Sequence, residues 1–329
     1  MDPLRTTAIP DLAQLPKALD KQFVFVIGAP RSGTTWLVRM LTEHRSVASI
    51  PKELTIFSRY MAPWVEQYEM ELAHHEQGKW SMGMPMLFDR QQFDALLRDL
   101  LDRFYGKVLG TNPAATHIVD KHPYYSQHLP VIDRSLPEAK FIHIIRDGRE
   151  VAVSMMSASR RIGFGAREIK GAATNWFQCV TQARRYGAQL GPQRYMEIRY
   201  EALRKDPVKE LERVFAFCGL ELEGGEVERL ADEYHISRKQ VSSGDASLNA
   251  LRDKPGAIWK KKLDLEQRYL FDRYAGHLLR ELGYANGNWW AFKAGDRLKM
   301  TFHPIRQRLR KTVHALLQIW FSPVIKRLN

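Results

Sequence analysis

The feature that most constrains the fold is a short apolar run that ends in a glycine-bearing loop. Phe23 to Ile27 are five consecutive apolar residues, and Gly28 follows them directly. A short unbroken apolar run is typical of a strand buried on both faces of a parallel sheet. After residues 28–35, apolar side chains recur at helical spacing, at Trp36, Leu37, Met40 and Leu41. The segment therefore predicts a strand, a loop and a helix in succession.

The same order returns further along the chain. Residues 141–145 form a second, mostly apolar run, residues 146–149 read Arg-Asp-Gly-Arg, and a helical pattern follows. Two strand-loop-helix units favour an α/β fold. We therefore expect a P-loop-like parallel sheet flanked by helices, with a helical insertion and a basic C-terminal helical tail.

The chain divides into three predicted parts. Residues 1–20 read as an N-terminal lead, residues 21–287 as the main domain and residues 288–329 as the tail. Within the main domain, residues 55–110 are rich in Met, Trp, Tyr and acids and read as mostly helical. We interpret them as an insertion on the substrate side. Amphipathic helices are also expected over residues 168–190 and 206–217.

The composition excludes several classes of protein. No run of about eighteen apolar residues occurs, and the proline-containing N-terminus lacks an apolar core, so we expect neither a membrane span nor a signal peptide. Two cysteines, Cys179 and Cys218, are too few for a disulfide framework and are expected as buried thiols in a cytoplasmic protein. No cluster of ligands has metal-binding spacing, so no metal is expected.

Much of the formal net charge of +13 lies near the C-terminus, where nine Lys or Arg residues stand against the single acid Asp296 after position 290. No motif typical of nucleic-acid binding accompanies this charge, so nucleic acid is not an expected partner. From Phe302 to Trp320, apolar residues recur every three or four positions with arginines between them. This basic amphipathic helix is expected either to pack on the protein or on a second subunit, or to lie peripherally on an anionic membrane surface.

The loop after the first strand predicts an anion site. A glycine turn between a strand and a helix points backbone N–H groups at one spot, and the helix N-terminus adds partial positive charge. Gly28 and Gly33 have the spacing of the nucleotide motif G-x-x-x-x-G-K-[ST], but Thr34 stands where that motif requires lysine, and the nearby cation is Arg31. This departure counts against an ATPase or a GTPase.

Residues 30–36, Pro-Arg-Ser-Gly-Thr-Thr-Trp, resemble the 5′-phosphosulfate loop of sulfotransferases that use 3′-phosphoadenosine 5′-phosphosulfate (PAPS). The resemblance implies that Arg31 faces the leaving-group oxygen and the transferring sulfuryl group, and that Trp36 lies near the adenine. The donor-binding residues that it implies in this loop are Arg31, Ser32, Gly33, Thr34, Thr35 and Trp36.

PAPS has a second anionic end, and residues 146–154 predict a site for it. Arg146 leaves the end of the second strand, and Ser154 follows eight residues later in a helix. A guanidinium and a hydroxyl so placed can converge on one phosphate. The pair resembles the 3′-phosphate motif of the same family.

Two further stretches resemble this family, and the resemblance covers roughly residues 20 to 285. Residues 198–203 are similar to a stretch that places Tyr200 at the adenine edge. Residues 252–260 look like a diverged C-terminal G-x-W-K loop, which implies that Gly256 and either Arg252 or Lys254 contact the 3′-phosphate. The matching elements are closest to the bacterial, carbohydrate and tyrosyl-protein branches.

Sulfuryl transfer needs a base for the acceptor hydroxyl and cations for the charge that moves. Glu53 resembles the glutamate base of the carbohydrate and tyrosyl-protein enzymes and is preferred, while His122 stays open as a base because it resembles the histidine of the cytosolic enzymes. Lys121 resembles the lysine that touches the transferring group, so Glu53, Lys121 and Arg31 form the expected catalytic set. Lys52 and His122 are expected to contact the acceptor.

The sequence therefore predicts an O-sulfotransferase that converts PAPS to adenosine 3′,5′-bisphosphate. The acceptor is a hydroxyl on a carbohydrate, a lipid-linked molecule or a tyrosyl residue. The alternatives are a P-loop kinase or NTPase, and an inactive nucleotide-binding protein at a membrane surface.

Overall fold

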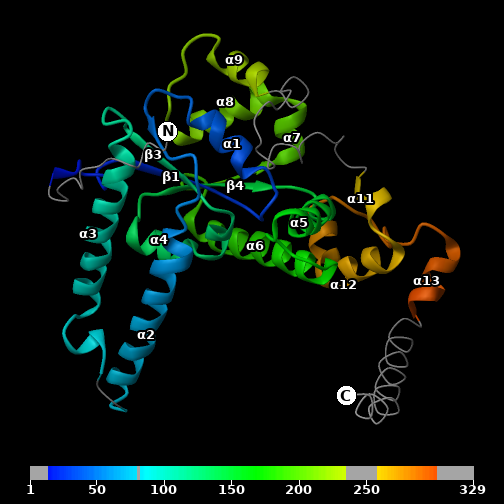
Figure 1. The fold of residues 1–329 in the computed structure, drawn as a ribbon, viewed down its shortest axis with the longest axis horizontal. Helices are drawn as coiled ribbons and strands as arrows, with labels where there is room; N and C mark the ends of the chain where they lie inside the picture. The colour runs from blue at the N-terminus through cyan, green and yellow to red at the C-terminus, as the bar shows by residue number, and fades with distance from the viewer. Residues whose placement is uncertain (1–13, 80–81, 235–257, 302–329) are drawn as a thin grey trace, which may run out of the picture.

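The computed structural model describes residues 14–79, 82–234 and 258–301. Five parallel strands form one sheet in the order β2-β3-β1-β4-β5, and helices lie on both of its faces (Figure 1). The strands are β1 (Gln22–Ile27), β2 (Val47–Ala48), β3 (His117–Lys121), β4 (Lys140–Ile145) and β5 (Tyr195–Arg199). The predicted P-loop-like α/β fold is confirmed.

The central strand β1 is buried because each of its faces meets a different set of helices. Phe23, Phe25 and Ile27 face one hydrophobic cluster, and Val24 and Val26 face the other. Each such buried side chain contributes about 1.5–3 kcal/mol. The first cluster includes side chains of α3 (Arg90–Leu109) and α4 (Leu129–Ser135), and the second includes side chains of α1 (Thr34–Leu41), α7 (Tyr200–Lys205), α8 (Pro207–Cys218) and α9 (Glu226–Glu233).

A third hydrophobic cluster forms beside the sheet. It joins α5 (Gly148–Ile162), α6 (Ile169–Leu190), α11 (Ile258–Lys262) and α12 (Leu265–Glu281), with Trp176 of α6 fully buried. The remaining helix near the end of the described chain is α13 (Ala294–Thr301). The predicted helices over residues 168–190 and 206–217 correspond to α6 and α8. Cys179 and Cys218 are free and buried, as predicted.

Local sequence signals set the beginnings of several helices. Asp89 accepts a hydrogen bond from the Gln92 amide at the start of α3, and the Gln92 side chain accepts one from the Asp89 amide. Asp264 and Gln267 form the same capping box at the start of α12. Such pairs satisfy N–H groups that have no partner within the helix.

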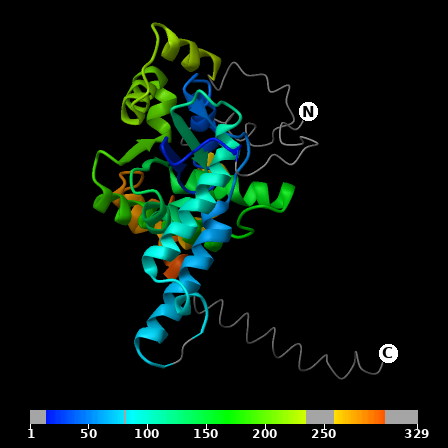
Figure 2. The ribbon, with the colours of Figure 1, turned by 90° about the vertical axis from the view of Figure 1, so that its left-hand side faces the viewer.

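The described residues between 55 and 110 form a helical hairpin, as their composition predicts. It consists of the π-helix η2 (Ile56–Met61), α2 (Ala62–Glu76), the 3-10 turn η3 (Met84–Met86) and α3. The hairpin extends away from the sheet, with α2 and α3 antiparallel (Figures 1 and 2). Tyr68 of α2 stacks on Phe93 of α3 with ring centroids 3.9 Å apart. Its place on the substrate side stays a prediction.

Among the helices in the described ranges, none is both long and apolar enough to cross a bilayer. The predicted amphipathic segment from Phe302 onward lies outside the described residues.

Candidate active site

The carboxyl ends of four neighbouring strands deliver the predicted site residues to one edge of the sheet. The loop 28–33 follows β1 and is two residues shorter than predicted, because α1 begins at Thr34. Lys121 and His122 stand at the end of β3, Arg146 follows β4, and Tyr200 follows β5. In an open parallel sheet, ligands bind at this edge. A short 3-10 helix, η4 (Pro123–Gln127), follows His122 and returns the chain towards α4.

The loop after β1 is tightly constrained. Gly28 has φ of +152°, and a Cβ there would lie 2.5 Å from the Ile144 carbonyl oxygen. Gly33 has φ of +103°, and a Cβ there would lie 2.7 Å from the Tyr200 ring. Glycine is thus required both for the backbone conformation and for the close approach of β4 and Tyr200.

Strain is concentrated in the two loops that carry predicted catalytic residues. Within the described ranges, only Arg31 and Thr55 are non-glycine residues with positive φ, at 74° and 56°. Arg31 lies in the loop after β1, and Thr55 follows Glu53 by two positions. A non-glycine residue held in this region costs on the order of 1–3 kcal/mol and is found preferentially at functional sites.

Arg146 is 4% exposed and is held from several directions. Its guanidinium lies 4.4 Å from the centroid of the Tyr200 ring, and its Nη1 donates to the Arg31 carbonyl oxygen at 3.3 Å. Its own carbonyl oxygen accepts from Trp176 Nε1 at 3.1 Å. The Tyr200 ring also packs edge-to-face with the Trp36 ring, and the two ring centroids are 5.8 Å apart. The residues predicted to flank the 3′-phosphate and the adenine therefore lie together.

Arg31 joins the two predicted anion sites. Its Nε donates to Ser154 Oγ at 3.1 Å, so its side chain contacts the hydroxyl that was predicted for the 3′-phosphate. The predicted role of Arg31 at the transferring group stays a prediction. Ser32 Oγ and the Tyr200 hydroxyl are both buried and, within the described residues, have no hydrogen-bond partner. Two unsatisfied buried hydroxyls at this edge are consistent with a polar ligand.

Lys121 connects the first turn of α1 to Glu53. Its Nζ donates to Thr35 Oγ1 at 3.0 Å and to Glu53 Oε1 at 2.7 Å. The Lys121 side chain is 13% exposed and the Glu53 side chain 34%. The cation is thus shared between the beginning of α1 and a carboxylate that solvent reaches. Lys52 is exposed beside Glu53.

The two candidate bases belong to one cluster. His122 Nε2 lies 3.5 Å from Glu53 Oε2, and its Nδ1 lies 3.4 Å from Ser58 Oγ. Burial lowers the pKa of His122 to about 4, although the nearby Glu53 carboxylate acts in the opposite direction. His122 is therefore neutral near pH 7 and can hydrogen-bond without adding positive charge. Ser58, at the start of the hairpin, carries no sequence signal of this contact.

A buried acid fixes the end of β3. Asp120 accepts from the Tyr105 hydroxyl at 2.7 Å and from the Tyr125 hydroxyl at 3.2 Å, and its Oδ1 accepts from the Lys121 amide at 2.6 Å. Burial raises the pKa of Asp120 to about 6, while these three hydrogen bonds act against that rise. The network holds Lys121 and His122 against the hairpin helix α3.

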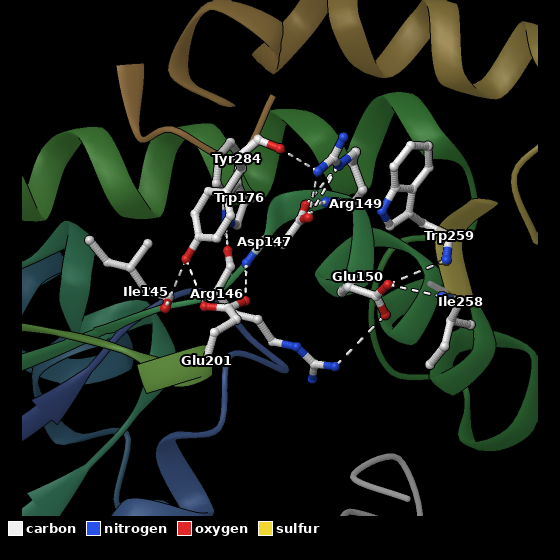
Figure 3. Close-up of polar contacts among 10 residues, drawn as sticks. All are labelled: Ile145, Arg146, Asp147, Arg149, Glu150, Trp176, Glu201, Ile258, Trp259 and Tyr284. Atoms are coloured by element: carbon white, nitrogen blue, oxygen red, sulfur yellow. Dashed lines mark hydrogen bonds and ion pairs between the residues drawn. The ribbon is translucent and has the colours of Figure 1, made fainter. Parts of the chain in front are cut away.

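A second network, shown in Figure 3, surrounds the start of α5. Asp147 binds the Arg149 guanidinium in a bidentate ion pair, and the same guanidinium lies 4.1 Å from the Trp259 ring centroid and 4.9 Å from that of Trp289. Glu150 faces Arg146 and accepts from the first amides of α11. Arg146 precedes α5 by two positions, so its pairing with Glu150 is not a contact between neighbours on one helix, and the sequence carried no helical signal of this network.

Arg252, Lys254 and Gly256 lie outside the described residues, so their predicted contacts stay predictions. Within the described ranges, no group of three or more His, Cys, Asp or Glu side chains is placed to hold a metal ion.

Comparison with known proteins identifies the family. A family model described as "Sulfotransferase family" matches residues 23–224. A Caenorhabditis briggsae protein provisionally assigned as a protein-tyrosine sulfotransferase is 26% identical over 262 residues, which are 74% of this chain and 85% of that protein. Protein-tyrosine sulfotransferase 2 of Gallus gallus is 26% identical over 60% of this chain, and the match spans 51% of the chicken protein.

A bacterial relative and a solved structure extend the comparison. Nodulation protein NoeE of Sinorhizobium fredii is 25% identical over 91% of this chain and 73% of its own length. The mouse sulfotransferase SULT7A1 complexed with PAP aligns over 83% of this chain and 90% of its own, with a TM-score of 0.49 and 17% identity. Because the family model covers more than half of the sequence, the chain belongs to the sulfotransferase family.

Proposed function

We propose that this protein transfers the sulfuryl group of PAPS to an acceptor hydroxyl, with Glu53 as the general base. The observation that carries the proposal is the position of Lys121, whose ammonium contacts both Thr35, in the first turn of α1, and the Glu53 carboxylate. A transfer between an anionic donor and a hydroxyl needs a cation and a base at the same edge of the donor site.

The residues present fit such a donor. The loop 28–33 and the first turn of α1, which begins at Thr34, suit the 5′-phosphosulfate end, while the buried Arg146 suits the 3′-phosphate. The unsatisfied hydroxyls of Ser32 and Tyr200 offer hydrogen bonds that no described residue uses. The aromatic pair of Trp36 and Tyr200 suits the adenine.

The proposed reaction is a single in-line displacement. The acceptor oxygen forms a bond to sulfur as the bond between sulfur and the 5′-phosphate oxygen breaks, and the acceptor proton passes to Glu53. Lys121 and Arg31 neutralise the charge that accumulates on the sulfuryl and leaving-group oxygens. As in phosphoryl transfer, positioning and electrostatics supply most of the acceleration.

The geometry favours Glu53 over His122 as the base. Glu53 is the more exposed of the two side chains, so an acceptor can reach it, whereas the His122 side chain is 8% exposed. Neutral His122 can donate from Nε2 to Glu53 Oε2 and keep the carboxylate aimed. We therefore assign His122 the task of orienting Glu53.

The acceptor is proposed at the level of a hydroxyl-bearing molecule. Several relatives are protein-tyrosine sulfotransferases, so a tyrosyl hydroxyl is the first acceptor to test. Tyr60 and Trp64, which follow Glu53 in η2 and α2, are 64% and 43% exposed and suit an aromatic or apolar acceptor.

Two measurements test the proposal. Calorimetry compares binding of adenosine 3′,5′-bisphosphate with binding of ATP and Mg²⁺, and we expect only the first to bind tightly. Incubation with labelled PAPS and pools of tyrosyl peptides, glycans and lipid-linked sugars should then give a labelled product whose mass is higher by one sulfuryl group. Tight binding of ATP with phosphoryl transfer would favour a kinase. Binding of the bisphosphate without transfer to any pool would favour an inactive nucleotide-binding protein.

A further inference from the structure

Glu150 of α5 contacts two different parts of the molecule, Arg146 and the beginning of α11 (Figure 3). Its residue is 3% exposed. Its Oε1 accepts from the amide nitrogens of Ile258 and Trp259 at 3.1 and 3.4 Å. Its Oε2 faces Arg146 Nη2 at 3.9 Å. The two oxygens of one carboxylate thus have separate partners.

The Oε1 contacts anchor the beginning of α11. The first amides of a helix have no partner within the helix, so an external acceptor has to satisfy them. Ile258 and Trp259 are those residues, and Glu150 reaches them from a position 108 residues earlier in the sequence than Ile258. Trp259 then packs over Arg149, so this anchor also fixes one wall of the Arg149 cluster.

The contact of Glu150 Oε2 with Arg146 affects the charge around the Arg146 guanidinium more than its position. Arg146 is already held by the Tyr200 ring and by the Arg31 carbonyl oxygen, and its distance to Glu150 exceeds that of a hydrogen bond. Glu150 therefore mainly adds a negative charge beside the buried Arg146 cation. Burial raises the pKa of Glu150, whereas Arg146 and the two amides act in the opposite direction and favour its ionised form.

We propose that Glu150 limits the affinity of the donor-nucleotide site by competing with the nucleotide phosphate for the charge of Arg146, while its other oxygen anchors α11. This inference rests on the proposed function, which puts a nucleotide phosphate at Arg146. Donor and product both carry the 3′-phosphate, so a site with uncompensated positive charge would also retain the product. A fixed carboxylate behind Arg146 keeps that phosphate exchangeable.

Substitution separates the two tasks. Glu150→Gln keeps an oxygen for the α11 amides and removes the charge, whereas Glu150→Ala removes both. Glu210→Gln is the matched control, because Glu210 is a mostly buried helical glutamate whose ion pair is with Arg213 of the same helix, α8, and not with a donor-site residue. Calorimetry measures the affinity for adenosine 3′,5′-bisphosphate, which depends on the charge of Glu150. The hydrogen-exchange rate of the peptide containing residues 258–262 measures how firmly Glu150 holds the beginning of α11.

We expect Glu150→Gln to bind adenosine 3′,5′-bisphosphate at least about fivefold more tightly than the unaltered protein, because a nearby repulsive charge is gone. Exchange at residues 258–262 should stay close to that of the unaltered protein in this variant. In Glu150→Ala it should become about tenfold faster, as loss of a buried acceptor predicts. Glu210→Gln should change neither quantity.

Tighter binding of adenosine 3′,5′-bisphosphate by Glu150→Gln would distinguish competition for Arg146 from a purely structural role of Glu150, because a loosened fold would weaken binding. Unchanged or weaker binding by Glu150→Gln, with Glu210→Gln unaffected, would overturn the inference. If Glu150→Gln does not fold, Glu150→Met removes the same charge at similar volume and is held to the same criterion. Failure of the unaltered protein to bind the bisphosphate would instead remove the proposed function itself.

Discussion

Lys121 Nζ lies 2.7 Å from Glu53 Oε1, although the two residues are 68 positions apart. The same nitrogen contacts Thr35 in the first turn of α1. The ammonium therefore bridges the beginning of α1 and the carboxylate that we propose as the base.

Glu53→Gln should lower turnover about a hundredfold or more while leaving the affinity for adenosine 3′,5′-bisphosphate within about twofold, since loss of a general base has effects of this size. Turnover is measured with labelled PAPS and binding by calorimetry. His122→Ala is the companion variant and should retain more activity than Glu53→Gln. An active Glu53→Gln protein together with an inactive His122→Ala protein would exchange the two roles.

Arg146→Ala should raise the dissociation constant for adenosine 3′,5′-bisphosphate at least about tenfold, because a partly buried Arg–phosphate contact is worth about 1.5–3 kcal/mol. Arg204→Ala is the control, since its guanidinium also lies near the Tyr200 ring, at 6.0 Å, but on an element outside the predicted anion sites. Equal affinities of the unaltered and Arg146→Ala proteins would show that the second anion site does not exist.

Gly33→Ala should destabilise the protein by about 2–4 kcal/mol, because it adds both a strained positive φ and a Cβ at 2.7 Å from the Tyr200 ring. Gly225→Ala is the matched control, because Gly225 is also a left-handed N-cap residue, with φ of +80°, but nothing lies within 4 Å of the place that a Cβ would take there. Gly225→Ala should destabilise the protein by about 1–2 kcal/mol. Denaturant unfolding of both variants checks the difference, and equal losses would mean that the Tyr200 ring moves aside freely.

Features with a local pattern could be predicted from the sequence. The apolar run before Gly28 predicted β1, and the structure confirms it, because an unbroken apolar run can be recognised without knowing its partners. The glycine spacing in residues 28–35 is also a local pattern, and the anion site that it predicts stays a prediction. Arg146 and Tyr200 were predicted by resemblance, and the structure places them in contact.

Contacts between distant segments could not be predicted in the same way. Glu53 and His122 were weighed as alternatives because each resembles the base of a different branch of the family. No periodic pattern links the segment after β2 to the end of β3, whereas the folded chain puts the two side chains 3.5 Å apart. Glu150 was overlooked for the same reason: its partners in α11 are set by how α5 packs on α11 across the third cluster. The rotation of a side chain such as Arg31 towards Ser154 depends on backbone strain that composition does not encode.

His143 should make the stability of the protein fall as the pH is lowered from neutrality. This residue of β4 is fully buried, and burial lowers its pKa to about 3, with Arg184 and Arg199 acting in the same direction. In the unfolded chain the same group titrates near its ordinary value of about 6.5. Between these two values the unfolded chain binds a proton that the folded protein does not, so its contribution is present above about pH 6.5 and is lost on acidification.

Protonation of His143 in the unfolded chain should lower the free energy of unfolding by about 1.4 kcal/mol for each pH unit below pH 6.5. Denaturant unfolding at pH 7, 6 and 5 measures it, with His143→Gln as the variant that cannot take up the proton. Gln can still hydrogen-bond to the Tyr195 hydroxyl, which lies 2.6 Å from His143 Nδ1. Asp120, whose pKa is raised to about 6, makes the stability of the folded protein rise as the pH falls below about 6, which is opposite to the effect of His143. This contribution is the same in the unaltered protein and in His143→Gln. The difference between the two curves therefore isolates His143, and parallel curves would show that its imidazole is protonated as readily in the folded protein as in the unfolded chain.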